Sequence, residues 1–371
     1  MTRACLLTPS LLAFLAAATA VPAATPVRTL AVGAAAPDFN LPAVDGRTYS
    51  LKDFAAAPIL VVVFTCNHCP TAQAYEHRII KLATDYKNKS VALVAINPND
   101  PRAVRLDELG YTDLGDSFED MKIRAKAKQF PFPYLYDGDT QKTARAYGVL
   151  ATPHVFVFDR ARKLRYVGRV DDGEVNPVKS HDARNAIDAL LDGKPVPRAK
   201  TRVFGCSTKW ADKRQDAKKA LAEWDKEPVK LEALGEAGVS RLVKNDTKKL
   251  LLVNVWQTGC GPCMTELPEL VTMNRMYRGR AFRLVTISID DPDNREAALK
   301  LLRKKHVAAS NYIVTVKDRD RFADRLDKEW EGPLPHTLLI APGGKILFRQ
   351  TGEIDPLEVR RAIVSYLGRT Y

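Results

Sequence analysis

Apolar runs recur in the same order in two halves of the chain. The first half has such runs over residues 59–64 and 154–158, and the second half has them over 250–256 and 336–340. Each run is short, rich in valine, leucine, isoleucine and phenylalanine, and bounded by turn residues. This pattern is typical of buried β-strands. We therefore expect at least two buried strands in each half.

The segments between and after these strands repeat as well. A Pro-His step precedes the later strand in both halves, and a turn, a further strand and a helical pattern follow it. From Cys66 to Pro153 is 87 residues and from Cys260 to Pro335 is 75, so one insertion of 12 residues accounts for the difference. A repeat of this length indicates two duplicated domains and not a solenoid.

The early strand of each half ends at a Cys-x-x-Cys motif, Cys66/Cys69 and Cys260/Cys263. A cysteine at the start of a helix meets unpaired amide N–H groups and the positive end of the helix dipole, which favour the thiolate. Two cysteines at this spacing can form a disulfide with each other after one of them has attacked. Zinc needs about four ligands, and His77 is the only ready extra donor near the first pair. The chain is therefore predicted to carry thiol–disulfide chemistry twice.

The second half resembles the TlpA/ResA-type thiol-disulfide oxidoreductases of the thioredoxin superfamily. The resemblance rests on the strand end at 253–256, the Cys-Gly-Pro-Cys turn, Glu266 and the Leu334-Pro335 step. The first half resembles redoxin proteins of the peroxiredoxin/TlpA neighbourhood, through residues 36–41 and 64–70. The resemblance implies an α/β fold with two thioredoxin-like domains, each a central mixed β-sheet flanked by α-helices.

The resemblance and the composition divide the chain into four parts. The apolar share of 46% and the charged share of 27% are those of globular domains. We expect a signal peptide at residues 1–24, a redoxin domain at 28–205, a basic linker at 206–230 and a TlpA/ResA-type domain at 231–371. The first domain is expected to extend, through its contacts, to about Trp210.

The first 24 residues read as a targeting segment. Arg3 is followed by the apolar stretch 11–17 and by small residues at 18–20, the pattern of a cleaved signal peptide. A retained membrane anchor is the alternative, but Pro9 and Pro22 bracket a stretch shorter than the roughly 20 residues of a span. The mature protein is therefore predicted to be periplasmic or otherwise exported.

In the second domain the resemblance assigns Cys260 as the attacking thiol and Cys263 as the resolving thiol. Glu266 comes one helical turn after Cys263 and is expected to handle the proton of that thiol. The position of the aspartate that serves this purpose in thioredoxin is occupied here by Asn254.

Substrate contacts are expected at the proline steps. Pro335 is expected to be cis, leaving the backbone of Leu334 free to pair with an extended substrate, and Thr152 with Pro153 should do the same in the first domain. Trp256, at the end of the strand that leads to Cys260, is the remaining predicted substrate contact.

The first site has Asn67 and His68 between its cysteines, and no carboxylate that matches Glu266 lies near Cys69 in the sequence. His68 is predicted to stabilise the thiolate of Cys66, which would make this pair the more oxidising of the two. An exposed His68 without a partner is the alternative. A fifth mature cysteine, Cys206, is expected to be a bystander or a bridge between the sites.

Two other functions compete for the first domain. A peroxiredoxin would have proline and threonine where this chain has Ile59 and Val63, which disfavours peroxidase activity. A copper chaperone would use Cys66, Cys69 and a histidine, because soft thiolates suit Cu(I). The main prediction involves no cofactor and no metal.

The expected partners are protein disulfide substrates and a membrane thiol that donates or accepts electrons. Residues 194–230 carry eleven Lys/Arg and five Asp/Glu, a net +6 of the whole-chain +13. A basic stretch of this kind fits weak contact with an anionic surface, but no nucleic-acid motif accompanies it, so no nucleic acid is expected.

Overall fold

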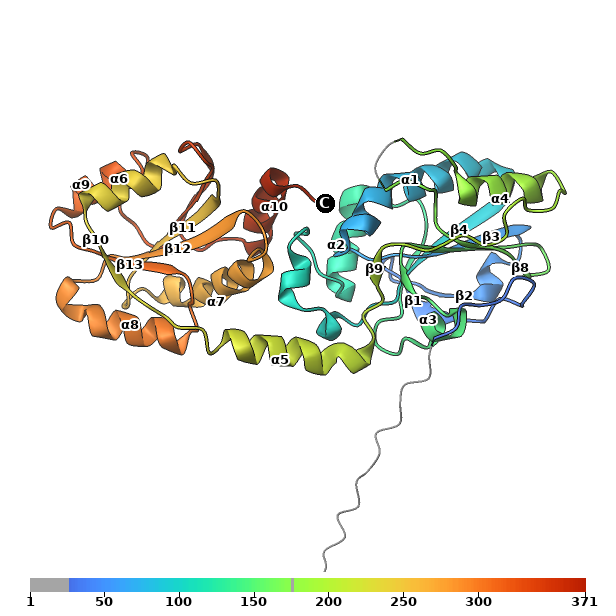
Figure 1. Ribbon diagram of the computed structural model, residues 1–371, viewed down its shortest axis with the longest axis horizontal. Helices are drawn as coiled ribbons and strands as arrows, with labels where there is room; N and C mark the ends of the chain where they lie inside the picture. Colours follow the sequence, from blue (N-terminus) through green and yellow to red (C-terminus); the bar gives the residue numbers. More distant parts are fainter. Residues whose placement is uncertain (1–26, 175–176) are drawn as a thin grey trace, which may run out of the picture.

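The computed structural model describes residues 27–174 and 177–371 of the 371-residue chain. These residues form two α/β domains joined by a charged helix, α5, over Arg214–Trp224 (Figure 1). The predicted signal peptide, residues 1–24, lies outside the described residues. Within the described ranges no helix has the length and apolar character needed to cross a membrane.

The first domain is built on a five-stranded sheet with the order β5-β4-β3-β7-β8. The central strand β3 pairs in parallel with β4 and antiparallel with β7, so the sheet is mixed. In chain order the elements are β1 (Asn40–Pro42), β2 (Thr48–Ser50), η1 (Leu51–Phe54), β3 (Ile59–Phe64), α1 (Pro70–Tyr86), η2 (Lys87–Lys89), β4 (Val91–Asn97), η3 (Pro101–Ala103), η4 (Leu106–Leu109), α2 (Phe118–Lys128), β5 (Tyr134–Tyr136), α3 (Lys142–Tyr147), β6 (Ala151–Thr152), β7 (His154–Phe158), β8 (Leu164–Gly168), α4 (Asp182–Leu191) and β9 (Cys206–Ser207).

The second domain repeats this plan with a six-stranded sheet in the order β10-β13-β12-β11-β14-β15. Its central strand β11 again has one parallel and one antiparallel neighbour, β12 and β14. The elements from the linker onward are η5 (Ala211–Lys213), α5, β10 (Glu232–Leu234), α6 (Glu236–Lys244), β11 (Leu250–Trp256), α7 (Gly261–Met276), β12 (Phe282–Ser288), η6 (Pro292–Asn294), α8 (Arg295–Lys304), β13 (Ser310–Val314), α9 (Arg319–Leu326), β14 (His336–Ile340), β15 (Ile346–Thr351) and α10 (Pro356–Leu367).

Each sheet is buried on both faces, which explains why the central strands are apolar without alternation. Odd-numbered residues of β3 pack with α1, α2 and α4, whereas the even-numbered ones pack with α3 and the N-terminal segment. In the second domain β11 shares one core with α7, α8 and α10 and the other with α6 and α9. The expected pair of thioredoxin-like domains with mixed sheets flanked by helices is confirmed.

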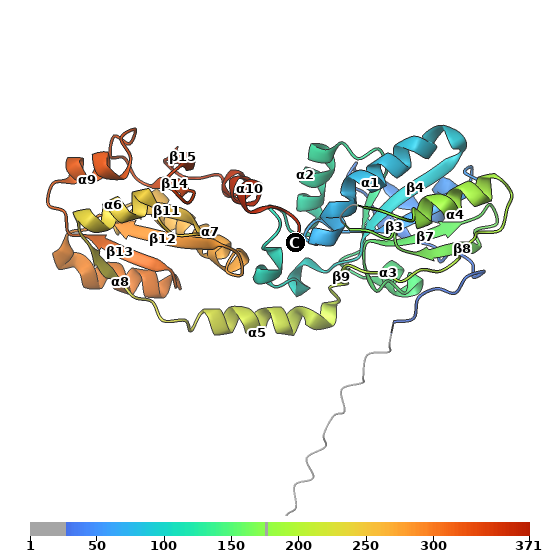
Figure 2. The ribbon, with the colours of Figure 1, turned by 45° about the horizontal axis from the view of Figure 1, so that its top comes forward.

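The two domains also touch directly, beside the linker helix. The connection from β4 to α2 spans residues 98–117, whereas β12 and α8 are joined by only 289–294, so the extra length of the first half lies here. This long connection packs against the C-terminal end of α7, where Tyr277 Oη donates to the Thr112 carbonyl at 3.0 Å. The C-terminus lies between the domains in both views (Figure 1, Figure 2).

Asp113 is the charged centre of this joint. It is buried and forms ion pairs with Arg124 of its own domain and with Arg361 and Arg369 of the other. Burial alone would raise the pKa of Asp113, but the nearby arginines, above all Arg369, hold it below its usual value. An ionised Asp113, paired with arginines of both domains, thus links the domains at this joint.

Candidate active sites

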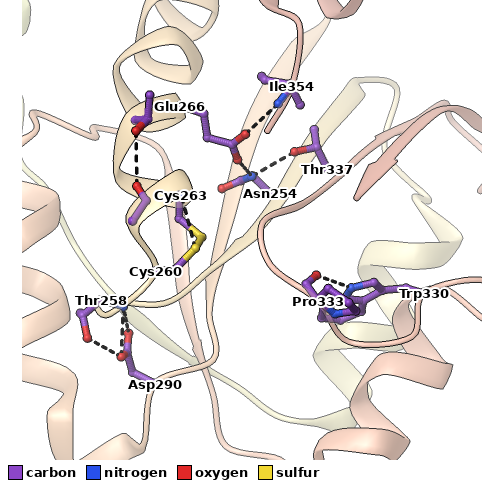
Figure 3. Close-up of a disulfide and its surroundings, with 12 residues drawn as sticks. Asn254, Thr258, Cys260, Cys263, Glu266, Asp290, Trp330, Pro333, Thr337 and Ile354 are labelled. Atoms are coloured by element: carbon purple, nitrogen blue, oxygen red, sulfur yellow. Dashed lines mark hydrogen bonds between the residues drawn. A yellow bond between two sulfur atoms is a disulfide. The ribbon is translucent and has the colours of Figure 1, made fainter. Parts of the chain in front are cut away.

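The second cysteine turn lies at the end of β11, as the sequence predicts. Cys260 is the N-cap of α7, and the Cys263 N–H donates to the Cys260 Sγ at 3.2 Å. The two cysteines form a disulfide (Figure 3). Cys260 is partly exposed and Cys263 is fully buried one turn further along. Only Cys260 is therefore presented to a partner.

Glu266 is buried on α7 behind this disulfide, at 2% exposure. Its carboxylate accepts hydrogen bonds from Asn254 Nδ2 at 2.6 Å and from the Ile354 N–H at 3.2 Å, which fix its position (Figure 3). Burial raises its pKa from 4.5 to about 7, against the lowering effect of these two bonds. A carboxyl with this pKa exchanges protons near neutral pH.

The predicted substrate contacts of the second domain differ in their exposure. The Leu334–Pro335 bond is cis, as expected, and no backbone partner of Leu334 occurs among the described residues. That backbone is therefore open to an extended chain. Trp256, in contrast, is fully buried in the core beneath the turn and presents no surface to a substrate. It supports the turn from below, which corrects the expectation of a direct contact.

The first cysteine turn is more enclosed. Cys69 is the N-cap of α1 and accepts from the Ala72 N–H at 3.4 Å, and Cys66 shares a hydrogen bond of 3.0 Å with Thr152 Oγ1. Both cysteines are free thiols, with exposures of 6% for Cys66 and 0% for Cys69. The Thr152–Pro153 bond is cis, as expected.

His68 is buried and paired, so the alternative of an exposed, unpartnered histidine is wrong. Its Nδ1 lies 2.5 Å from Asp116 Oδ2, and Asp116 also accepts from the N–H groups of Asn67 and His68 and from Asn99. Burial opposes a charge on His68, but Asp116 outweighs it and raises the pKa of His68. Asp116, a carboxylate that the sequence did not predict at this site, reaches the turn from the long β4–α2 connection.

The electrostatics of the pair favour Cys69 as the thiolate. Burial opposes ionisation of Cys69, but contacts with Cys206 and Cys66, the charge of His68 and the Ala72 N–H together hold its pKa well below the usual value. Burial, followed by Cys69 and Asp116, raises the pKa of Cys66. The charge of His68 thus favours the thiolate on Cys69, whereas the sequence-based expectation placed the thiolate on Cys66, whose Sγ also lies within 4.8 Å of a His68 ring nitrogen.

The first site also differs in what covers its proline step. Strand β9 pairs antiparallel with β6, with Thr152 opposite Cys206 and Ala151 opposite Ser207. The expected substrate-binding backbone of Thr152 and Pro153 is therefore taken by a segment of the same chain. Residues 206–210, at the start of the expected linker, lie against the first domain, with Trp210 packed on its core, as the expected reach of that domain to Trp210 implies.

An aspartate supports each cysteine turn, and neither aspartate was predicted from the sequence. Asp290, two residues after β12, accepts from the N–H of Thr258 at 3.2 Å and from its hydroxyl at 2.6 Å. Asp116 does the same for Asn67 and His68 in the first domain. The position of Asp290 after a parallel strand is a usable signal, because such strands end at the same edge as the cysteine turn. Asp116 lies near the end of the long β4–α2 connection, at no fixed distance from a strand, and has no such signal.

The first site also contains a candidate set of metal donors. Single donor atoms of Cys66, His68 and Asp116 lie within 4.8 Å of one another. The oxygens of Asp116 already accept four hydrogen bonds from protein groups, whereas His68 Nε2 is buried without a partner. The thiols suit a soft ion, but Asp116 would have to give up existing partners to bind one.

Two domains of this topology, each with a Cys-x-x-Cys turn opposite a cis proline, define a protein of the thioredoxin superfamily. Residues 32–167 and 226–349 match the AhpC/TSA family, and the chain belongs to that family. The match covers both domains separately, in agreement with the duplication.

Two curated relatives carry names that state an activity. Thiol-disulfide oxidoreductase ResA of Bacillus subtilis (strain 168) is 29% identical over 120 residues, which cover 32% of this chain and 63% of the relative. Thiol:disulfide interchange protein DsbE of Pseudomonas aeruginosa PAO1 is 34% identical over 116 residues, covering 31% of this chain and 58% of the relative. The matches thus span somewhat less than two thirds of each of these relatives.

Among solved structures, an uncharacterized conserved protein of Geobacillus kaustophilus is 42% identical, with a TM-score of 0.44, over 48% of this chain and 92% of its own. A hypothetical protein of Sinorhizobium meliloti 1021 is 36% identical, with a TM-score of 0.45, over 50% of this chain and 97% of its own.

Proposed function

We propose that this protein is an exported thiol-disulfide oxidoreductase that reduces protein disulfides at the Cys260/Cys263 site. The observation that carries the proposal is the second turn itself. There, a partly exposed cysteine at a helix start has a buried partner one turn behind it and a buried carboxyl with a pKa of about 7. The names of the ResA and DsbE relatives support the same chemistry.

In the proposed reaction the Cys260 thiolate attacks one sulfur of a substrate disulfide and releases the other as a thiolate. The Cys263 thiol then gives its proton to the Glu266 carboxylate and attacks Cys260 Sγ. The Cys260–Cys263 disulfide forms, the second substrate sulfur leaves as a thiolate, and the proton on Glu266 passes to solvent. The open backbone of Leu334 would hold the substrate as an added strand.

The oxidised site then needs an electron donor for the next cycle. We propose a membrane thiol protein in this role, because residues 1–24 have the pattern of an export signal and an exported protein is separated from cytosolic reductants. Contact with an anionic surface through the basic linker would keep the protein near such a donor.

The test uses the full mature chain with Cys66, Cys69 and Cys206 replaced by serine, so that only the second site remains. We expect this variant to accelerate the reduction of insulin by dithiothreitol, and a further Cys260→Ser change to return the rate to background. Thr265→Ala, an exposed change on the same helix, is the matched control and should keep the activity. Full activity in the Cys260→Ser protein would overturn the assignment.

A second candidate function rests on the donor set at Cys66, His68 and Asp116. If the first domain held copper, reduced protein incubated with Cu(I) should retain about one ion after gel filtration, and Cys66→Ser should abolish this. Retention of no metal by the reduced protein would exclude the candidate.

A further inference from the structure

The first site contains a third cysteine, Cys206. It lies beside the residue before the cis proline, a position whose backbone is unpaired among the described residues of the second site. Cys206 stands opposite Thr152 in the β6–β9 pair, and Thr152 is the residue before the cis proline. In the second domain the corresponding residue, Leu334, has no such partner among the residues described. An extended segment added at this position is the arrangement expected for a bound substrate strand.

Cys206 contacts the sulfur of Cys69. Its N–H donates to Cys69 Sγ at 3.3 Å, and its side chain packs against the buried cluster of Cys66, Cys69 and Ala72. The Thr152 carbonyl also lies 3.4 Å from Cys69 Sγ. Side chains alternate along a strand, so Cys206 faces the cluster while Ser207 is exposed.

The neighbouring residues hold this segment in place. Gly205 has a φ of +136°, and a Cβ there would lie 2.1 Å from the Thr152 carbonyl, so only glycine permits so close an approach. On the other side, the N–H of Lys209 donates to Asn99 Oδ1 at 2.8 Å and its Nζ to Glu108 at 2.5 Å. Trp210 carries the Arg145 guanidinium over its ring at 4.5 Å. The segment is anchored on both sides of the thiol.

We propose that β9 is a built-in substrate strand and that Cys206 is a third redox cysteine of the first site, exchanging disulfides with Cys69. The proposal concerns the first site and rests on the proposed function only for the general chemistry. When Cys66 and Cys69 are joined, Cys206 loses its proton and attacks Cys69 Sγ. The Cys66–Cys69 bond breaks, the Cys69–Cys206 bond forms, and Cys66 leaves as a thiolate and takes up a proton. One disulfide moves and no external electrons are needed.

The surroundings of the cluster also provide a hydrogen-bond donor for the leaving group. The leaving Cys66 thiolate meets the hydroxyl of Thr152, which lies 3.0 Å from Cys66 Sγ.

The experiment uses the full mature chain with Cys260 and Cys263 replaced by serine, so that the second site is silent. In a Cys66→Ser background, oxidation by oxidised glutathione should join Cys69 to Cys206, detected by peptide mapping under non-reducing conditions. The matched control moves the thiol by one residue, with Cys206→Ser and Ser207→Cys together, and should lose the cross-link. Circular dichroism checks that each variant is folded.

A second measurement keeps Cys66 in place. After full oxidation, alkylation should label Cys66 in one fraction of the molecules and Cys206 in the rest, because the disulfide exchanges between two positions. Labelling of Cys206 alone, or a control that cross-links as well as Cys206 does, would overturn the proposal. Neither measurement depends on insulin reduction, so a failure of the proposed function at Cys260 leaves this result interpretable.

Discussion

Cys260 and Cys66 both follow a buried central strand and precede a helix, yet the surroundings of the two cysteines differ. Cys260 is partly exposed beside an open proline step, whereas Cys66 is 6% exposed and its proline step is covered by β9. A buried carboxyl lies behind the second turn, and a His68–Asp116 pair lies beside the first. The same fold therefore exposes Cys260 to partners but encloses Cys66 within its own domain.

This difference shows that the cysteine spacing alone does not decide which thiol reacts. At the second turn the exposed first cysteine is the nucleophile of the proposed reaction. At the first turn the charges favour the thiolate on Cys69, which faces Cys206 of the same chain. The next three predictions test this contrast, beginning with the largest expected effect.

Replacing Glu266 by glutamine should lower the rate of insulin reduction by roughly 10²-fold, within the range for a general acid–base group. The wild-type rate should rise with pH through about 7, where the Glu266 carboxyl ionises, and Glu266→Gln should lose this rise. Stability should respond in the opposite sense. Because the pKa is raised on folding, the wild type should become less stable as pH rises through about 7, and the variant should not.

The matched control for this prediction is Glu269→Gln, a partly exposed glutamate on the same helix. It should leave both the pH profile and the rate unchanged. An unaltered pH profile in Glu266→Gln would reduce Glu266 to a structural partner of Asn254.

Replacing His68 by alanine should make the first pair less oxidising. The charge of His68 stabilises the Cys69 thiolate and hence the reduced form, so its loss should lower the midpoint potential by about 30 mV, or tenfold in the equilibrium constant. The measurement is a redox titration by alkylation and mass, with Cys206, Cys260 and Cys263 replaced by serine. His77→Ala, an exposed histidine on α1, is the control, and an equal shift there would remove the role of His68.

The same titration addresses the order of the two sites. The pair Cys66/Cys69 is predicted to have the higher reduction potential, because the charge of His68 lies near Cys69 and stabilises its thiolate. Titration of the second pair, with the first-site cysteines replaced by serine, provides the comparison. Equal potentials, or a lower value for the first pair, would contradict this order.

The smallest expected effect concerns the joint between the domains. Tyr277→Phe removes the hydrogen bond to the Thr112 carbonyl and should lower the free energy of unfolding by about 1 kcal/mol, as measured by denaturant titration. Tyr366→Phe, at a residue with 45% exposure, should have almost no effect. Equal stability of the two variants would indicate that this hydrogen bond contributes nothing to the stability of the folded state.

The sequence predicted the parts of this molecule that are set by local pattern. The central strands, the two cysteine turns at helix starts and both cis prolines follow from apolar runs and repeated motifs. Helix α5 at Arg214–Trp224 falls inside the basic linker expected at 206–230. These features depend on residues close together in the chain.

The parts that were missed depend on distant residues. Asp116 lies 48 positions from His68, and Cys206 lies 137 positions from Cys69. No local pattern encodes these distances, and the connection that delivers Asp116, residues 98–117, is much longer than its counterpart at 289–294. For the same reason the burial of Trp256 was misjudged, because its core comes from several elements that close over it.

Helix α7 has a consequence for the path of electrons through the chain. Its 16 residues extend for about 24 Å at 1.5 Å per residue, with Cys260 at one end and Tyr277, which touches the first domain, just beyond the other. Thiol–disulfide exchange needs two sulfurs in contact. While the domains are docked in this way, α7 holds Cys260 away from the joint. In this arrangement Cys260 cannot reach a sulfur at the joint.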